Sequence, residues 1–505
     1  MSRPARGGSG RAQQPPAGQG HLHTVDVAVA GGGAAGLYAA LCAARAGASV
    51  ALLTATPLAQ TASYWAQGGL AAAVGADDSF ELHLADTERA GRGAMRPSAA
   101  QVLVREAPAR LRDLQSLGLR FDADRFGRLA LGLEGGHSVR RIVHAGGSAT
   151  GRRMLRQLSA LVAEHSSIKV LEGDAGRVRE LLLQDGRCVG VACESGAAIA
   201  ARAVLISAGG AAALWSRTTN PPGSVGTGLV IAQAAGAQLA DLEMVQFHPT
   251  AVIGVPGREG FLITEAIRGE GATLHGADGE RFVDELAPRD EVARAIQTQL
   301  RDSGRRSVGL DMRAIDPALF PNVVDALRDA GLDPTRELIP VAPAAHYTMG
   351  GIVADLHART SVSGLFALGE SACTGLHGAN RLASNSLSEC FVFAHRAIEV
   401  ALEEPSGPGP VDLSRAQRTM PPPVVQQSTR QALWTHANIE RDAQGLAQLA
   451  QDPYPLARLI GACALMRCES RGAHQRTDHP TTDSKLDRRH IVVDPDMALH
   501  WETWE

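Results

Sequence analysis

The chain has 505 residues, of which 45% are hydrophobic, and its formal net charge is -4. This length exceeds what one hydrophobic core supports, so we expect two or three domains. The small negative charge argues against a nucleic-acid-binding protein, because it provides no basic field that would attract phosphates. The sequence contains no run of about 18 apolar residues, so we expect no membrane-spanning helix.

The seven cysteines are scattered, and none belongs to a C-x-x-C pair. Their spacings match no common zinc or iron–sulfur pattern, so we predict no metal site and reduced thiols in a cytoplasmic protein. Residues 1–22 combine arginines with glycine, proline, serine and glutamine and lack the apolar segment of a secretory signal. We interpret these residues as a disordered tail, whose role the sequence leaves open.

A short apolar run at 25–30 predicts a buried strand, and a helical pattern at 37–46 follows it after a glycine-rich turn. Residues 49–53 predict a second buried strand. This order is typical of a β–turn–α–β unit in a parallel sheet. Further strands are expected at 203–207 and 365–368, so segments far apart in the chain supply one sheet.

The turn between the first strand and helix has the G-x-G-x-x-G spacing of dinucleotide-binding proteins, although a purely structural glycine turn is the alternative. Gly31 permits the tight turn, Gly33 lets the backbone approach a pyrophosphate, and Gly36 permits close packing of helix on strand. An NAD site expects a carboxylate at the end of the second strand, where this chain has Thr54 and Ala55. The sequence therefore favours FAD.

Two later segments are predicted to contact FAD. Residues 62–69 lie where the chain should meet the isoalloxazine ring, with a surface loop as the alternative. In the segment 364–390, Glu370 ends a strand and is available to hold a ribose. Ser384 and the two residues after it are expected to cap the next helix, leaving its first N–H groups for an oxygen-rich ligand. The predicted cofactor-binding residues are Gly31, Gly32, Gly33, Ala34, Ala35, Gly36, Thr54, Ala62, Ser63, Tyr64, Trp65, Ala66, Gln67, Gly68, Gly69, Ala175, Gly176, Glu370, Ser386 and Leu387.

The fold class predicted is α/β, with a Rossmann-like FAD-binding domain, an inserted α+β capping domain and a C-terminal helical domain. The FAD-binding domain is expected at 23–241 and 348–404, and the capping domain at 242–347, a block that does not follow the sheet pattern. Prolines near 405–410 indicate a linker before the C-terminal domain, 411–505. The helical patterns of that domain cover 425–449 and 456–467.

Clusters of cations and hydrogen-bond donors lie at 134–144, 246–250, 264–290 and 343–351. A single histidine or arginine in such a cluster is more often structural than ligand-binding. Together, however, the cations can neutralise a small dicarboxylate beside the flavin, because the planar guanidinium binds a carboxylate with two hydrogen bonds. The candidate cations are His248, Arg289, His346 and Arg381.

Several long motifs carry a family resemblance: Tyr-Trp-Ala-Gln-Gly-Gly, Gln-Phe-His-Pro-Thr, Glu-Leu-Ala-Pro-Arg-Asp, Pro-Ala-Ala-His-Tyr and His-Gly-Ala-Asn-Arg-Leu-Ala-Ser-Asn-Ser-Leu. Over residues 25–390 the chain resembles the succinate dehydrogenase/fumarate reductase flavoprotein superfamily and, within it, the L-aspartate oxidase family. The resemblance implies FAD-dependent oxidation of L-aspartate to iminoaspartate, with electrons passed to O₂ or fumarate. It also implies a place at the first step of de novo NAD synthesis, before quinolinate synthase. The alternatives are a soluble, succinate-oxidising fumarate reductase and a flavin-binding protein without turnover.

The same resemblance assigns roles to the clustered residues. Arg289 is implied to be the catalytic proton-transfer residue, although an arginine pKa normally exceeds 12 and a purely charge-stabilising role is the alternative. Glu134 is implied to face the ammonium group of the substrate. Relatives with covalent FAD have a histidine where this chain has Ala62, so we expect non-covalent FAD. The substrate-binding residues implied are Glu134, Gln246, His248, Thr264, His346 and Arg381.

The chain departs from the family pattern in the cofactor region. The family's Gly-Asp-Gly is Gly226-Thr227-Gly228 here, Ala55 stands where some members have a basic residue, and Ser207 begins a variant of Ala-Thr-Gly-Gly. These departures bring FAD affinity into question more than the choice of substrate.

Overall fold

The computed structural model describes residues 23–405 and 415–505. The predicted tail, 1–22, and the first four residues of the predicted C-terminal domain lie outside the described residues. Among the described residues, no helix combines the length and apolar character needed to cross a bilayer. All seven cysteines are unpaired thiols.

The largest sheet has the strand order β18-β7-β8-β9-β1-β2-β6, and β16 also pairs with β9. The first strand, β1 (His23–Ala30), lies between β2 (Val50–Thr54) and β9 (Ala198–Ile206) and is parallel to both. From the other end of the chain, β16 (Leu365–Ala367) adds a parallel strand beside β9. The predicted strands and their shared sheet are therefore confirmed. The remaining strands are β6 (Ile168–Glu172), β7 (Val178–Gln184), β8 (Arg187–Cys193) and β18 (Gln417–Arg418).

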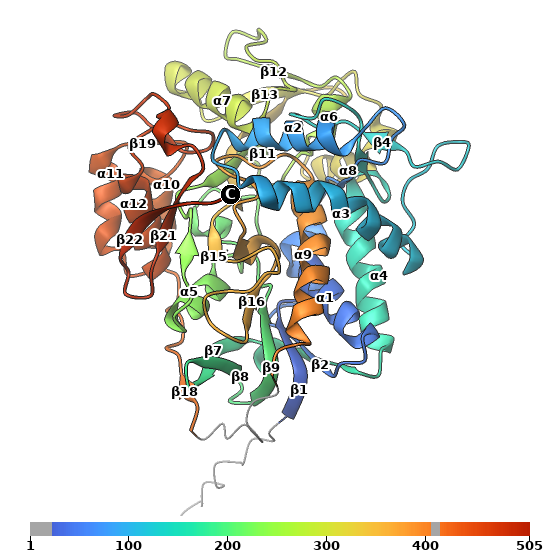
Figure 1. Cartoon of the computed structure of the whole chain (residues 1–505). Helices are drawn as coiled ribbons and strands as arrows, with labels where there is room; N and C mark the ends of the chain where they lie inside the picture. The colour runs from blue at the N-terminus through green and yellow to red at the C-terminus, as the bar shows by residue number, and fades with distance from the viewer. Residues whose placement is uncertain (1–22, 406–414) are drawn as a thin grey trace, which may run out of the picture.

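Three helices lie side by side on one face of this sheet (Figure 1). α1 (Ala34–Arg45) is the predicted helix after the glycine turn, and it packs between α4 (Thr150–Glu164) and α9 (Asn385–Ala401). The ring of Tyr38 meets Phe391 edge-on, with the ring centroids 5.1 Å apart. This packing fixes the N-termini of α1 and α9 above the carboxyl ends of the strands. Two further helices of this region are α2 (Phe80–Gly91) and α3 (Pro97–Ser116).

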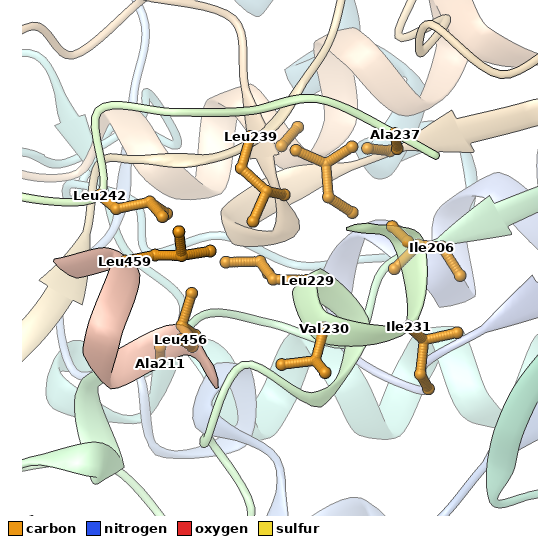
Figure 2. Close-up of a cluster of buried hydrophobic side chains, with 14 of the residues drawn as sticks. Ile206, Ala211, Leu229, Val230, Ile231, Ala237, Leu239, Leu242, Leu456 and Leu459 are labelled. Atoms are coloured by element: carbon orange, nitrogen blue, oxygen red, sulfur yellow. The ribbon is translucent and has the colours of Figure 1, made fainter. Parts of the chain in front are cut away.

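The C-terminal region packs against the FAD-binding region through a second apolar core. Figure 2 shows α5 (Thr227–Ala234) meeting α12 (Pro455–Met466), with Leu229 of α5 facing Leu456 and Leu459 of α12. These side chains are almost completely buried. The chain's last quarter is thereby attached to the Rossmann-like sheet.

The segment predicted to be the capping domain forms its own four-stranded sheet in the order β11-β14-β13-β12. Its long strands, β11 (Val245–Val252) and β14 (Ile339–Thr348), pair antiparallel with register shifts beside Phe247 and His248. The helix α7 (Arg289–Ser303) packs against both strands. That this segment is a separate domain stays a prediction. Its other elements are α6 (Ala266–Gly269), β12 (Thr273–His275), β13 (Val308–Asp311) and α8 (Pro321–Asp329).

One helix of the C-terminal region was predicted wrongly. The pattern at 425–449 is divided into α10 (Gln427–His436), β19 (Glu440–Arg441) and α11 (Ala443–Gln448). Asp442 begins the second helix, because its carboxylate accepts a hydrogen bond of 2.7 Å from the Gly445 N–H. In contrast, α12 agrees with the pattern predicted at 456–467.

The chain ends in a hairpin that the sequence did not predict. Its two strands extend a five-stranded sheet of order β17-β15-β10-β21-β22, in which β10 is the last strand before the capping segment. The strands of this sheet are β10 (Leu239–Ala240), β15 (Gly351–Val353), β17 (Ala372–Cys373), β21 (Arg489–Val493) and β22 (Leu499–Thr503). The short strands elsewhere are β3 (Leu70–Ala71), β4 (Leu131–Gly132), β5 (Ile142–Val143) and β20 (Gln475–Arg476).

Candidate active site

A single cavity of about 440 Å³ extends from the glycine turn of β1–α1 to the clustered cations of the capping segment. Its walls come from residues between 30 and 390, and both the large sheet and the sheet of the capping segment contribute to them. The predicted cofactor and substrate residues therefore belong to one continuous space. The predicted residues that line it are Gly31, Gly32, Gly33, Ala34, Ala35, Thr54, Ala62, Ser63, Trp65, Ala66, Gln67, Gly68, Gly69, Glu134, Gly176, His248, Thr264, Arg289, His346, Glu370, Arg381, Ser386 and Leu387.

The glycine turn has the tight geometry expected of a dinucleotide site. Gly31 has a φ of +130°, and a Cβ there would lie 2.2 Å from the Ser207 carbonyl oxygen. A Cβ at Gly36, which does not itself line the cavity, would lie 1.9 Å from the Gly31 carbonyl oxygen. Only glycine fits either position, and the N-terminus of α1 consequently opens into the cavity, where its N–H groups suit a pyrophosphate.

The segment 62–69 lies along the same cavity. The Gln67 side-chain amide donates a 2.7 Å hydrogen bond to the Leu262 carbonyl of the capping segment, while its Oε1 is buried without a hydrogen-bond partner. An acceptor left free in this position fits the N–H groups of an isoalloxazine ring. Tyr64 does not line the cavity, and its ring packs instead against Trp65, with centroids 5.6 Å apart.

The two adjacent predicted cofactor-binding positions, Ala175 and Gly176, differ in their placement. Gly176 lines the cavity beside the end of β2, because a Cβ there would lie 2.6 Å from the Thr54 carbonyl oxygen. Its neighbour Ala175 does not reach the cavity. Arg177, which the sequence analysis did not select, lines it and donates a 3.2 Å hydrogen bond to the Ala55 carbonyl. An arginine just before β7 thus lies beside the position whose basic residue is missing.

Glu370 follows β16 and faces the cavity, as predicted. Its Oε1 accepts a 2.9 Å hydrogen bond from the Thr348 N–H. Burial raises the pKa of this carboxyl to about 7, against the opposing effect of the Thr348 hydrogen bond. Thr227, the departure from the family's Gly-Asp-Gly, also lines the cavity and is the first residue of α5.

The predicted helix cap at Ser384 is wrong. Ser384 precedes α9 with a φ of +61°, and its side chain accepts no hydrogen bond from the helix. Its hydroxyl instead donates a 2.7 Å hydrogen bond to Glu134 Oε2. The first N–H groups of α9 are therefore without a side-chain cap, and Ser386 and Leu387 of the first turn line the cavity.

Arg289 is the first residue of α7 and is held by two partners. Its Nε donates a 2.6 Å hydrogen bond to Glu265 Oε2, and an Nη group donates to Gln246 Oε1 at 3.3 Å. Gln246 does not line the cavity, since its amide is bound behind Arg289 to Asn380 and to the Arg381 carbonyl. Gln246 therefore orients the arginine rather than contacting a ligand. Glu265 was not selected from the sequence, although it adjoins Thr264 in a cluster that was.

Arg381 lies on the opposite side of the predicted substrate space. Its guanidinium carbon lies 4.7 Å from the centre of the Tyr347 ring, and an Nη group donates a 3.0 Å hydrogen bond to the Ser386 hydroxyl. Burial and the charge of Arg289 lower the pKa of Arg381 to about 10. Arg381 therefore keeps its charge at neutral pH, and its buried Nε has no partner among the described residues.

The two predicted histidines come from neighbouring strands and lie with their ring centroids 5.1 Å apart. His248 Nδ1 accepts a 3.2 Å hydrogen bond from the Thr250 N–H, so in the neutral ring the proton is on Nε2. His346 Nδ1 lies 2.8 Å from the Thr219 hydroxyl. Burial and the charge of Arg289 hold the pKa of both histidines well below the usual value. Both rings are therefore neutral hydrogen-bonding groups, and the arginines supply the positive charge.

Glu134 gives the substrate end one negative group. Its side chain is buried, and while Oε2 is bound by Ser384, Oε1 has no hydrogen-bond partner within the described part of the chain. Burial raises the pKa of this carboxyl, but the charges of His144 and Arg289 and the Ser384 hydrogen bond outweigh burial and lower it to about 2. His144 Nε2 lies 3.9 Å from Oε1, beyond hydrogen-bond distance. The cavity thus contains a charged carboxylate with one free oxygen.

The cavity also has walls that the sequence did not reveal. Thr219 and Asn220 reach it by holding the His346 ring and its carbonyl, and Phe261 and Leu262 close it from the capping segment. None of these residues belongs to a charged cluster or a glycine motif. The hydrogen bonds of Thr219 and Asn220 with His346 join residues 127 and 126 positions apart, so only the folded chain reveals them.

Comparisons with known proteins agree with this geometry. Residues 26–387 match the FAD binding domain family, and residues 450–503 match the fumarate reductase flavoprotein C-terminal family. In fold, 96% of the chain superposes on 97% of a structure of E. coli quinol fumarate reductase carrying a substitution in FrdA, with a TM-score of 0.85 and 27% identity. A structure of Mycobacterium smegmatis Sdh1 with UQ1 gives a TM-score of 0.79 at 28% identity, over 96% of this chain and 94% of that one.

Curated relatives share the name L-aspartate oxidase. The relative from Agrobacterium fabrum is 42% identical over 94% of this chain and 95% of its own. The relative from Caulobacter vibrioides is 44% identical over 92% of this chain and 96% of its own, and that from Streptomyces coelicolor is 39% identical over 94% and 92%. With the FAD-type glycine turn and the cation-lined cavity, these matches establish that the chain belongs to the L-aspartate oxidase family of the succinate dehydrogenase/fumarate reductase flavoproteins.

Proposed function

We propose that this chain uses non-covalently bound FAD to oxidise L-aspartate to iminoaspartate and passes the electrons to O₂ or fumarate. The observation that carries the proposal is Glu134. Its charged carboxylate is buried beside two arginines, lines the cavity and keeps one oxygen without a hydrogen-bond partner among the described residues. Succinate has no cation to offer this oxygen, whereas the ammonium group of an amino dicarboxylate does.

The chain's own residues account for the binding of FAD and substrate. The glycine turn, the free Gln67 acceptor, Glu370 and the first turn of α9 fit the pyrophosphate, isoalloxazine and ribose of FAD. Ala62 lines the cavity with no side chain able to bond covalently to a flavin. Arg289 and Arg381 are placed to pair with the two substrate carboxylates, and His248 and His346 to donate or accept hydrogen bonds.

The proposed chemistry divides between cofactor and protein. Bound FAD supplies the acceptor for the hydride that leaves the substrate α-carbon. Glu134 and the arginines orient that carbon, and the capping segment excludes water from it. Arg289 is the proposed catalytic residue: it stabilises the carboxylate charge, and when fumarate is the acceptor it donates the proton that the second carbon needs. Glu265 holds it for both tasks.

We further propose a cytoplasmic location and hand-over of iminoaspartate to quinolinate synthase in NAD biosynthesis. Seven unpaired thiols suit a reducing compartment. Iminoaspartate is an imine that water hydrolyses, which favours an enzyme that consumes it promptly. Mixing the purified chain with quinolinate synthase and aspartate tests the hand-over, because quinolinate should form with little free oxaloacetate.

Anaerobic flavin reduction tests the main proposal. L-Aspartate should bleach the FAD absorbance, and succinate should not. Glu134→Gln should slow bleaching by aspartate by at least about 10²-fold, because a buried ionic partner of the ammonium is lost, while Glu164→Gln at the exposed end of α4 should have no effect. Bleaching by succinate but not by aspartate would refute the proposal. Acid precipitation should leave the FAD in the supernatant, and flavin remaining in the pellet would contradict non-covalent binding.

A further inference from the structure

His144 is a chemically competent residue that the proposed mechanism does not use. It follows β5 and lies behind Glu134 as seen from the cavity, which Glu134 lines and His144 does not. We propose that His144 is a proton-relay residue: the proton lost by the substrate ammonium passes through Glu134 to His144 and then to solvent. This inference rests on the proposed oxidation of an amino dicarboxylate.

The side chains of His144 and Glu134 each point one unpaired atom toward the other. His144 Nε2 and Glu134 Oε1 are both buried, and neither has a hydrogen-bond partner among the described residues. They face each other at 3.9 Å. A side-chain movement of about 1 Å brings this separation into hydrogen-bond range. Buried polar atoms without partners are rare, so two that point at each other indicate a contact made at another stage of the reaction.

Glu134 and His144 also differ in their exposure to solvent. Glu134 is almost fully buried and touches the cavity, whereas the His144 side chain keeps 14% of its surface exposed. The pair therefore connects the substrate space with the outside. A proton that arrives at Oε1 from the cavity side can leave through the imidazole on the other side.

A glycine lies beside each of the two side chains and leaves room for it. A Cβ at Gly132 would lie 2.6 Å from His144 Cε1, and one at Gly68 would lie 3.1 Å from Glu134 Oε1. Gly132 belongs to β4, which pairs with β5 immediately before His144. The imidazole thus packs closely on Gly132, where any larger residue would displace it.

The reaction requires such an outlet. Aspartate enters with an ammonium group, and loss of one N–H proton frees the nitrogen lone pair. That pair forms the C=N bond while the C–H electron pair leaves as hydride to the cofactor, so atoms and electrons balance. One proton must therefore leave the site in every turnover.

Glu134 alone is a poor final acceptor for that proton. Arg289 from α7, Arg268 from α6 and Arg381 from the loop before α9 surround its carboxylate with positive charge, and His137 adds a further titratable ring. These charges favour the deprotonated carboxylate. The proton must therefore pass on, and the His144 imidazole, whose Nε2 lies 3.9 Å from Oε1, is the group placed to take it.

Rapid-mixing kinetics of the FAD-loaded enzyme under anaerobic conditions separate this role from a structural one. His144→Asn should slow flavin reduction by aspartate about 10²-fold at pH 7 and remove the ionisation from its pH profile. Added imidazole should restore part of the rate. Reoxidation of dithionite-reduced enzyme by fumarate or O₂ involves no N–H proton, so it should keep the wild-type rate. His165→Asn, at the end of α4, is the matched control and should change neither half-reaction.

Two results would overturn the inference. One is an unchanged rate and pH profile for aspartate in His144→Asn, and the other is an equal loss in both half-reactions, which indicates a structural role. His144→Gln serves if the asparagine variant does not fold. Failure of aspartate to bleach the wild-type enzyme would instead refute the proposed function itself, so the two failures are distinguishable.

Discussion

Two buried carboxylates in one cavity show how surroundings decide the charge of a residue. Glu134 and Glu370 are both withdrawn from solvent, and burial alone raises the pKa of each. His144, Arg289 and the Ser384 hydroxyl together outweigh burial at Glu134, whose pKa falls to about 2. Glu370 has weaker compensation from Thr348 and its pKa rises to about 7. The substrate side therefore carries a fixed charge, and the cofactor side a titratable one.

Replacing Glu370 by glutamine should stabilise the FAD-free protein and weaken FAD binding. The folded pKa of about 7 exceeds the usual 4.5, so this carboxyl costs stability as pH rises from about 4.5 to 7, and the full cost is present above pH 7. That cost is at most about 3 kcal/mol. Glu370→Gln should therefore raise the thermal midpoint at pH 8 by a few degrees and leave it nearly unchanged at pH 4. Calorimetry and FAD titration measure both effects, and equal midpoints at pH 8 would contradict the assignment.

At the scale of elements, the chain crosses between the FAD-binding region and the capping segment twice, at residues 241–244 and 348–350. These two crossings lie against each other. The Met349 N–H donates a 2.9 Å hydrogen bond to the Met244 carbonyl, and a Cβ at Gly350 would lie 2.2 Å from the Asp241 carbonyl oxygen. Any hinge motion of the capping segment must therefore bend these two crossings together. Gly350 permits their contact.

Gly350→Ala should therefore disturb the hinge more than either binding site. Forcing the two crossings apart should lower the free energy of unfolding in urea by about 1–3 kcal/mol. It should also slow flavin reduction by aspartate, while FAD affinity changes much less. Gly331→Ala at the end of α8 is the control, because no atom lies within 4 Å of a Cβ there, although its φ of +83° adds backbone strain. Wild-type kinetics in Gly350→Ala would show that the crossings do not act as a hinge.

Local patterns predicted those elements whose geometry depends on nearby residues. The β1–turn–α1–β2 unit is of this kind, since the glycine spacing and apolar runs determine it. The cap at Ser384 could not be predicted correctly, because Glu134, 250 residues away, competes for its hydroxyl. The place of Gln246 behind Arg289 likewise depends on the register shift between β11 and β14. Such contacts are set by packing, which one sequence does not display.

At the scale of the whole molecule, the C-terminal region holds the start of the capping segment through buried charge. Arg467, at the end of α12, donates 2.7 Å to Glu243 Oε1 and 3.0 Å to Glu469 Oε1 and lies 3.9 Å from Asp241. These side chains are almost completely withdrawn from solvent, and Trp501 of the last strand covers the guanidinium at 4.8 Å. The C-terminal region therefore neutralises the buried carboxylates of Asp241 and Glu243, which lie where the capping segment begins.

Removing this arginine should destabilise the molecule strongly. Arg467→Met keeps the side-chain length but removes the cation that contacts Glu243, while Asp241 keeps His490 as its partner, and the loss should cost about 3–5 kcal/mol in urea unfolding. Burial already raises the pKa of Glu243, so the loss should be larger at pH 8 than at pH 5, where the carboxyl binds a proton more readily. Arg301→Met, which breaks the half-exposed pair with Glu440, is the control and should cost at most about 1 kcal/mol.

The double variant Arg467→Met with Glu243→Gln identifies the cause of that loss. If an uncompensated charge is responsible, removing the carboxylate should recover part of the stability and reduce the difference between pH 8 and pH 5. If the loss came only from the missing contacts of the guanidinium with Glu469 and Trp501, the second substitution would recover nothing. Because Glu243 lies two residues before β11, which carries His248, recovery of stability should be accompanied by recovery of aspartate-dependent flavin reduction. Stability that returns without activity would show that the C-terminal charge does not position the capping segment.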